Sequence, residues 1–285
     1  MDFRRVKAIL LAVFLALNLF LGYQWWTLRS AVSVYAQPLS DQMASAQSAL
    51  AKHNVAVAAP IPTLQPVMSL LKVAPDRAAP GSVAALALPG RIAALGAGRP
   101  NVWGGAAGRV AETGPGRFTV AYNARLPAGT VPVRPGHVAS DVRRWLERHA
   151  YAFNAYAPLL SRHTRATYTL VYTQSENGYP LWNARLEATV RGGRLTGYTQ
   201  TALRVLGTGE SRQVINAASA LLSIATFMDK GHINADNTVV GIRLGYFSQV
   251  QSDRLWYLAP VWRVDSRLGV FYVNAFTGEV GVEHG

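Results

Sequence analysis

The residues best suited to catalysis or metal binding are spread along this chain rather than grouped. The histidines are His53, His137, His149, His163, His232 and His284. No two of them are three to five residues apart, so no single helix or loop supplies a local zinc pair. The chain has no cysteine, which excludes disulfides, zinc–thiolate sites, iron–sulfur clusters and a cysteine nucleophile. We expect no metal and no cofactor, and we place His149 in the core, on the apolar face of a helix.

The carboxylates and the motifs give no sign of an enzyme either. Glu147, Glu176, Glu187 and Glu279 fall in different expected elements, so folding would have to assemble any general acid–base pair. The sequence has no nucleophile elbow, P-loop, HExxH zinc motif or dinucleotide-binding glycine pattern. We therefore predict a protein that is not an enzyme. A cell-wall hydrolase or transferase with a composite site is the least favoured alternative.

Composition narrows the class of protein further. The chain has 285 residues, of which half are hydrophobic and 15% are charged, which excludes a wholly disordered protein. Lysine and arginine number 28 against 15 aspartates and glutamates, a net charge of +13. This net positive charge is consistent either with an acidic partner, such as anionic lipid or wall polymer, or with a compositional bias without a partner. We favour the bias, because the arginines are scattered, and we expect no nucleic-acid partner.

One apolar run near the N-terminus is long enough to cross a membrane. Residues 8–26 span roughly the ~30 Å hydrocarbon thickness as a helix rising about 1.5 Å per residue. Arg4, Arg5 and Lys7 precede this run and should stay in the cytoplasm. We predict a cytoplasmic segment at 1–7 and a transmembrane helix at 8–26. The protein would be a single-pass membrane protein with its bulk outside the cell.

The N-terminal segment has one alternative interpretation and one predicted contact face. A cleavable signal peptide ending at Ala36 is the alternative to a retained anchor, but that site lies far beyond the apolar run, so we favour the anchor. Asn18 places an amide in the apolar span, where it could hydrogen-bond to a neighbouring helix. With Phe14, Leu17 and Leu21 it forms a stripe that we predict to contact a partner in the membrane.

The rest of the chain predicts an α+β fold with two modules, each one helix followed by an antiparallel sheet. The boundaries that we predict are a stalk helix in 27–53, an irregular first module in 54–137, and helix-plus-strands units in 138–208 and 209–285. Within the first module, 74–116 has almost no helical or strand period and is expected to form a Gly/Pro/Ala-rich mobile loop.

Apolar periodicity locates the elements of the two units. We predict helices at 40–52, 141–157 and 213–230, and strands at 117–125, 166–174, 181–191, 194–206, 238–249, 255–264 and 270–274. The strands are rich in aromatic residues, which we interpret as sheet core in preference to an exposed patch for a protein or a wall glycan. These residues are Trp182, Trp256, Tyr257, Trp262, Phe271, Tyr272 and Phe276.

Both ends of the sequence resemble the YycI family, which contains membrane-anchored accessory proteins of a Gram-positive cell-wall two-component system. At the start, residues 1–7 and 17–24 are similar to the family's opening segment. At the far end, 259–264 and 271–279 are similar to its last hairpin and to the related YycH and PepSY-like modules. The motif residues there are Pro260, Trp262, Asn274, Ala275, Phe276, Thr277, Gly278 and Glu279.

The resemblance implies a regulator of a sensor histidine kinase, WalK (also called YycG), that acts with a YycH-like protein through transmembrane helix contacts. It also implies an α+β extracytoplasmic part and no catalysis. From a different class, the alternative is a secreted PepSY-type inhibitor or propeptide of a protease.

Overall fold

The computed structural model describes residues 14, 17–18, 20–22, 38–95, 101–123, 131–164, 166–231, 236–267 and 269–283. The predicted cytoplasmic segment and most of the predicted transmembrane helix lie outside these residues. Within the described ranges, none of the helices has the length and apolar character that crossing a membrane requires. The described residues from Leu39 to Glu283 form an α+β fold dominated by sheet, as the apolar periodicity predicts.

The helices described are α2 (Leu39–Ala51), α3 (Pro80–Ala87), α4 (Val138–His149) and α5 (Ala217–Lys230), with a 3₁₀ turn at Phe153–Ala155. The strands are β1 (Val55–Val57), β2 (Val67–Pro75), β3 (Ala93–Ala94), β4 (Val102–Gly105), β5 (Gly108–Gly114), β6 (Arg117–Tyr122), β7 (Tyr156–Thr164), β8 (Thr167–Glu176), β9 (Tyr179–Arg191), β10 (Arg194–Thr201), β11 (Leu203–Gln213), β12 (Asn237–Phe247), β13 (Trp256–Ser266), β14 (Gly269–Asn274) and β15 (Val280–Glu283). Hydrogen bonds connect them in the order β11-β2-β13-β12-β9-β10-β6-β5-β4-β3. Strand β1 joins β12, β14 and β15 extend from β13, and β8 and β7 extend from β9.

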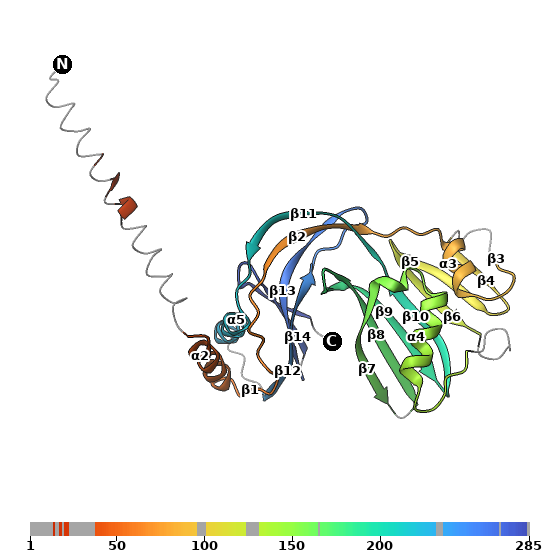
Figure 1. Ribbon diagram of the computed structural model, residues 1–285, viewed down its shortest axis with the longest axis horizontal. Coiled ribbons are helices and arrows are strands. Elements are labelled where there is room, and N and C mark those ends of the chain that lie inside the picture. The colour runs from red at the N-terminus through yellow and green to blue at the C-terminus, as the bar shows by residue number, and fades with distance from the viewer. Residues whose placement is uncertain are drawn as a thin grey trace, which may run out of the picture.

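Two large hydrophobic cores divide these elements into two lobes, which Figure 1 shows on either side of the C-terminus, and a small third cluster contains Trp182, Val261 and Tyr272. The terminal lobe contains α2, β1, β2, α5 and β11–β15, so it combines both ends of the described chain. The central lobe contains α3, α4 and β3–β10. Strand β9 is shared, because Leu181 and Ala184 lie in the terminal core while Leu186, Ala188 and Val190 lie in the central one.

In the terminal lobe, α2 lies beside α5 on one face of the sheet (Figure 1). Ala46 and Leu50 of α2 are completely buried, so this helix is part of a folded core and not a projecting stalk. Asn216 caps α5 by accepting a 2.8 Å hydrogen bond from the Ser219 backbone N–H. The helix then covers Leu258 and Trp262 of β13, which belong to the same core.

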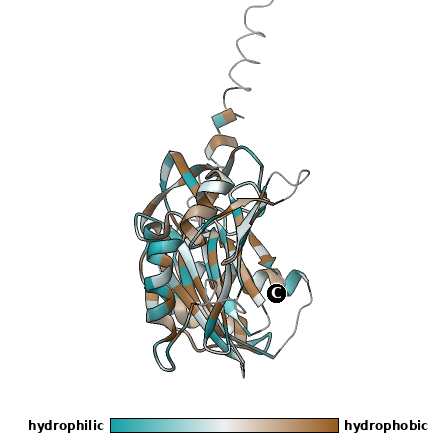
Figure 2. Cartoon of the chain, turned by 90° about the vertical axis from the view of Figure 1, so that its right-hand side faces the viewer, coloured by the Kyte–Doolittle hydropathy of each residue, from teal (hydrophilic) through white to brown (hydrophobic). Residues whose placement is uncertain are grey.

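In the central lobe, α4 covers the sheet with Val142 and Leu146, both fully buried. Trp145 from the same helix donates a 2.9 Å hydrogen bond from Nε1 to the Tyr122 hydroxyl. Burial raises the pKa of Tyr122 to about 12. Hydrophobic and hydrophilic residues alternate along the strands (Figure 2), as in β6, where buried Phe118 and Val120 are separated by a half-buried residue.

The structure changes several predicted boundaries. The helix expected over 141–157 spans 138–149, because the chain turns at Ala152, whose φ of 46° is left-handed. Phe153 and Tyr156 still reach the central core from a 3₁₀ turn and a strand, which is why the apolar period continued past the helix. The strand expected over 194–206 divides at Ala202 into β10 and β11.

The expected irregular module at 54–137 is shared between the lobes. Both β1 and β2 belong to the terminal lobe, where β1 pairs with β12 and β2 lies between β11 and β13. The stretch 74–116 carries α3 and β3–β5, although we expected a loop there. Its strands are short and rich in glycine and alanine, so their apolar period is too weak to predict them. The cores therefore do not follow the domain boundaries predicted from the sequence.

A carboxylate in the first turn of α4 allows a test of pH dependence. Asp141 accepts hydrogen bonds from Arg134 Nη2 at 2.7 Å, Nε at 3.0 Å and the backbone N–H at 3.1 Å. These bonds hold the pKa of the Asp141 carboxyl well below its usual range, and the bonds from the Arg134 guanidinium have the largest effect. A depressed pKa in the folded state stabilises the fold above the unfolded-state value of about 3.9, and the effect disappears as the pH falls through the folded-state pKa.

We expect Asp141→Asn to lower the thermal midpoint at pH 7, with the difference from wild type shrinking as the pH falls below about 4. Circular dichroism melts between pH 7 and pH 3 measure it. Glu147→Gln is the matched control, since Glu147 pairs with Arg143 on the same helix but is 48% exposed. A difference that stays constant over this range would contradict the assignment.

Candidate functional site

The residues predicted to contact a partner in the membrane are described as helical, and all four are exposed. Phe14 is 67%, Leu17 55% and Leu21 51% exposed. The Asn18 amide donates a 2.9 Å hydrogen bond from Nδ2 to the carbonyl oxygen of Phe14, one turn earlier in the same helix. The spacing of these residues places them on one face. Their contact with a partner stays a prediction.

The family-motif residues near the C-terminus build structure. Trp262 is 1% exposed in the terminal core, and its Nε1 donates a 2.8 Å hydrogen bond to the carbonyl of Ile215, which precedes α5. The carbonyl of Pro260 accepts a 2.8 Å bond from the backbone N–H of Ala275. These bonds attach β13 to α5 and to the end of β14.

The second part of the motif forms the turn between β14 and β15. The Asn274 side chain accepts hydrogen bonds from the backbone N–H groups of Phe276 at 2.9 Å and Thr277 at 3.2 Å. Thr277 Oγ1 accepts a 3.3 Å bond from the Glu279 N–H, and Gly278 has a left-handed φ of 76°. The Asn-Ala-Phe-Thr-Gly-Glu string is therefore the turn that joins β14 to β15.

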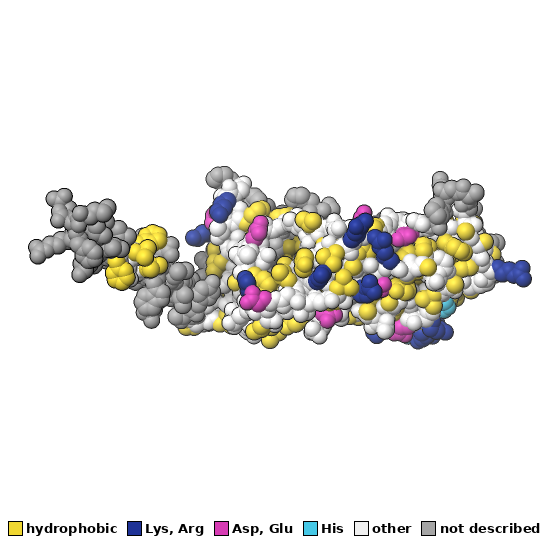
Figure 3. Space-filling view, turned by 90° about the horizontal axis from the view of Figure 1, so that it is seen from above, with side chains coloured by type: hydrophobic (Ala, Val, Ile, Leu, Met, Phe, Trp, Pro, Cys, Tyr) yellow, Lys and Arg dark blue, Asp and Glu magenta, His cyan; other side chains and the backbone are white. Residues whose placement is uncertain are grey.

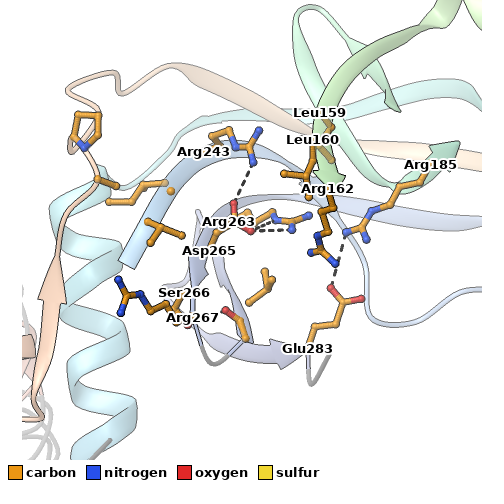
Figure 4. Close-up of a pocket in the computed structure, with 17 residues that line it drawn as sticks. Leu159, Leu160, Arg162, Arg185, Arg243, Arg263, Asp265, Ser266, Arg267 and Glu283 are labelled. Carbon is orange, nitrogen blue, oxygen red and sulfur yellow. Dashed lines mark hydrogen bonds and ion pairs between the residues drawn. The ribbon is translucent and has the colours of Figure 1, made fainter. Parts of the chain in front are cut away.

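The most chemically distinctive surface is a cleft between the two lobes, which we call the arginine cleft. Its volume is about 980 Å³. Strands β7 and β9 of the central lobe line one side, and β12, β13 and β15 line the other (Figure 4). Its charged residues are Arg162, Arg185, Arg243, Arg263, Arg267, Asp265 and Glu283.

Asp265 fixes two of these arginines. Its Oδ1 lies 2.8 Å from both Nε and Nη2 of Arg263, and its Oδ2 lies 3.1 Å from Nη2 of Arg243. The alternation of β13 produces this placement, because Trp262 and Val264 face the terminal core while Arg263 and Asp265 face the cleft. One carboxylate thus orients two guanidinium groups (Figure 4).

Two aromatic rings pack against the guanidinium group of Arg263. Its guanidinium carbon is 4.8 Å from the Trp182 ring centre and 5.8 Å from the Tyr272 ring centre. The Arg263 side chain is only 9% exposed. Phe247 stacks on Tyr272 with the ring centres 3.8 Å apart, so the aromatic support is itself packed.

A second group forms around Tyr272. Its hydroxyl donates a 3.0 Å hydrogen bond to Glu283 and accepts one of 3.1 Å from Arg185 Nη2. Burial is the main cause that raises the pKa of Tyr272 to about 12, so the Tyr272 hydroxyl is a neutral hydrogen-bond donor at neutral pH. Arg185 Nη2 also lies 4.0 Å from the Glu283 carboxylate.

The cleft carries a net charge of +3, from five arginines against two carboxylates. Arg263 Nη1 and Arg185 Nε are buried and have no hydrogen-bond partner among the described residues. The side chains of Arg162 and Arg267 are exposed and form no ion pair with the described part of the chain. Such an arrangement can bind an anion.

Other predicted candidates are not brought together. Within the described residues, no group of three or more histidines, aspartates and glutamates could hold a metal ion. His149 stacks on Trp145 with the ring centres 3.8 Å apart, which agrees with its predicted place on a helix face. Trp182, Trp256, Trp262 and Tyr272 are buried, as the core interpretation of the aromatics predicts, while Tyr257 is 54% exposed.

The arginine cleft is not among the sites predicted from the sequence. The arginines are far apart in the sequence and were interpreted as scattered by composition. Basic side chains are indeed dispersed among hydrophobic ones on the face shown in Figure 3. The local signal was Arg263 followed by Asp265 inside the otherwise apolar run of β13, a position where an unpaired charge would be costly.

Comparison with known proteins identifies the family. No curated protein matches the chain. Among solved structures, an uncharacterized protein from Eubacterium rectale shares the fold, with a TM-score of 0.50 and 10% identity over 80% of this chain and 90% of its own. The Bacillus megaterium YpeB C-terminal domain has a TM-score of 0.39 and 12% identity over 72% of this chain and 96% of its own. The family described as YycI protein matches residues 118–276, more than half of the sequence. The chain therefore belongs to the YycI family, as the motifs at its two ends predict.

Proposed function

We propose that this protein is a membrane-anchored regulator of a WalK-like (YycG-like) sensor histidine kinase, acting with a YycH-like partner through its N-terminal helix. The observation that carries the proposal is the YycI family match over residues 118–276. That family is regulatory rather than catalytic and is linked to the YycG/WalK system. The specific partners, the mechanism and the membrane location are our proposal.

The N-terminal sequence supports a role for the membrane helix. Residues 8–26 are apolar over the length of a bilayer core and follow three cations, a pattern that supports an orientation with the bulk of the chain outside. We propose that regulation passes through contacts within or outside the membrane.

The folded part supplies a physical link to that helix. The first element described after the proposed span is α2, which begins at Leu39, with twelve residues between it and the span in the sequence. Because α2 is packed on α5, a change in the terminal lobe would reach the anchor through a short connection. A ligand outside could influence the kinase only by binding two arrangements of this assembly with different affinity.

The test is to disrupt the helix face without preventing insertion. We expect Leu17→Ala/Asn18→Val/Leu21→Ala to reduce the kinase recovered by co-immunoprecipitation from membranes by about tenfold, since the interhelical hydrogen bond of Asn18 contributes roughly 1 kcal/mol and about 1.4 kcal/mol corresponds to a factor of ten. Ile9→Ala/Leu19→Ala, on the opposite face by helical spacing, is the matched control and should leave recovery unchanged.

Two results would contradict the proposal. The first is unchanged recovery of the kinase after residues 8–26 are exchanged for an unrelated transmembrane helix. The second is a fully competent mature protein in the medium that begins after Ala36, found by amino-terminal sequencing. That product would favour the secreted inhibitor or propeptide.

A further inference from the structure

We propose that the arginine cleft binds a phosphate ester, as a site of this protein distinct from its helix contacts. The inference goes beyond the proposed regulation of a kinase, because binding at the cleft can be measured without any partner protein. It rests on the donors that the cleft leaves unpaired, on how these donors are held, and on the shape of the anion that fits them.

The unpaired donors are the first argument. Buried polar groups almost always have hydrogen-bond partners, and a buried guanidinium N–H without one is costly. Arg263 Nη1 is such a group, on a side chain that is 9% exposed and lines the cleft. Arg185 Nε, on another strand lining the same cleft, is a second. Both atoms belong to guanidinium groups that line the cleft, where a bound anion would offset their positive charge.

The rigidity of the donors is the second argument. Asp265 holds Arg263 by two contacts of 2.8 Å, and the Trp182 and Tyr272 rings support the guanidinium. Asp265 also holds Arg243, so two cations are fixed before any ligand arrives. Holding donors in place before binding reduces the entropy that a ligand must overcome.

The geometry favours a tetrahedral anion over a planar one. A carboxylate presents two oxygens in one plane and is matched by one guanidinium fork, and the Nε and Nη2 edge of Arg263 is already occupied by Asp265. The remaining donors belong to β7, β9, β13 and the turn after β13, on different sides of the cleft (Figure 4). A phosphate group presents oxygens in several directions and can accept from several arginines at once. The volume of about 980 Å³ exceeds what one phosphate ion needs, so the phosphate would be esterified to a larger group.

The experiment is calorimetric titration of the full chain, in a neutral detergent at low ionic strength, with three sources of phosphate. The probes are inorganic phosphate, a glycerol-phosphate oligomer and dihexanoyl phosphatidylglycerol, with dihexanoyl phosphatidylcholine as the zwitterionic control. Polyglutamate tests an acidic peptide. We expect wild type to bind at least one phosphate ester more tightly than polyglutamate and inorganic phosphate, and the preferred ester identifies the source as polymer or lipid.

Variants tie the binding to the cleft. Arg162→Gln/Arg267→Gln removes two exposed cations that have no structural partner among the described residues, so it should fold normally and weaken binding by about tenfold. Arg263→Lys keeps the charge but loses the fork, and should weaken binding similarly. Arg148→Gln, an exposed arginine on α4 in the central lobe, is the matched control and should bind like wild type.

Three results would overturn the proposal. They are no binding of any phosphate probe by wild type, equal binding by wild type and Arg162→Gln/Arg267→Gln, and tighter binding of polyglutamate than of every phosphate probe. If Arg263→Lys does not fold, the double variant decides alone. Loss of kinase association in the helix variants, with phosphate binding intact, would separate this inference from the proposed function.

Discussion

Trp262→Ala should lower the free energy of unfolding by about 4 kcal/mol, because it removes a large side chain from the centre of the terminal core. Trp262 is 1% exposed and lies between β13 and α5. The substitution would leave a cavity and would also leave the Ile215 carbonyl without the 2.8 Å hydrogen bond from the indole. Urea unfolding at pH 7, followed by circular dichroism, measures the effect.

Two further variants interpret that result. Trp262→Phe keeps most of the apolar volume but loses the hydrogen bond, so its cost should be smaller, about 1–2 kcal/mol. Tyr257→Ala changes another aromatic residue of β13 that is 54% exposed, and should change the free energy of unfolding little. If Trp262→Ala were no more destabilising than Tyr257→Ala, Trp262 would not have the structural role assigned to it here.

Asp265→Ala should lower the free energy of unfolding by about 3 kcal/mol. Asp265 is the ion-pair partner of Arg263, whose side chain is only 9% exposed, and the substitution would leave that cation buried without its counter-ion. Asp265→Ala/Arg263→Met should recover most of the loss, because replacing a buried ion pair with apolar side chains is often neutral.

The matched control is Glu210→Ala, which breaks the pair between Glu210 and Arg212 on β11. Those side chains are 78% and 65% exposed, so its effect should stay below about 1 kcal/mol. Denaturant unfolding of the four proteins at one pH forms the comparison. A double variant no more stable than Asp265→Ala alone would mean that the buried cation is not the source of the cost.

Local periodicity in the sequence predicts much of this fold. The helix expected at 213–230 is α5 over 217–230, and the strands expected at 238–249 and 255–264 are β12 and β13 with shifts of a few residues. These segments have strong apolar patterns because each packs one face against a single core. The family was likewise recognisable, because its C-terminal motif encodes a turn whose hydrogen bonds need asparagine and threonine at fixed positions.

Long-range pairing could not be predicted in this way. Strand β2 lies between β11 and β13, whose residues are more than a hundred positions away, and nothing in its own sequence selects those partners. The arginine cleft has the same origin. Arg162, Arg185 and Arg263 line one cleft only because of the order of the strands in the sheet, which no local pattern contains.

The composition of the terminal lobe has a consequence for biosynthesis. Its core needs α2 and β2 from the beginning of the described chain and β12–β15 from the end, whereas the central lobe is encoded by one continuous stretch between them. In a chain emerging from the ribosome, the central lobe can therefore fold before the strands and the helix that pack against α2 and β2 have been synthesised. The part nearest the proposed anchor closes last, and a chain truncated before β12 would leave it open.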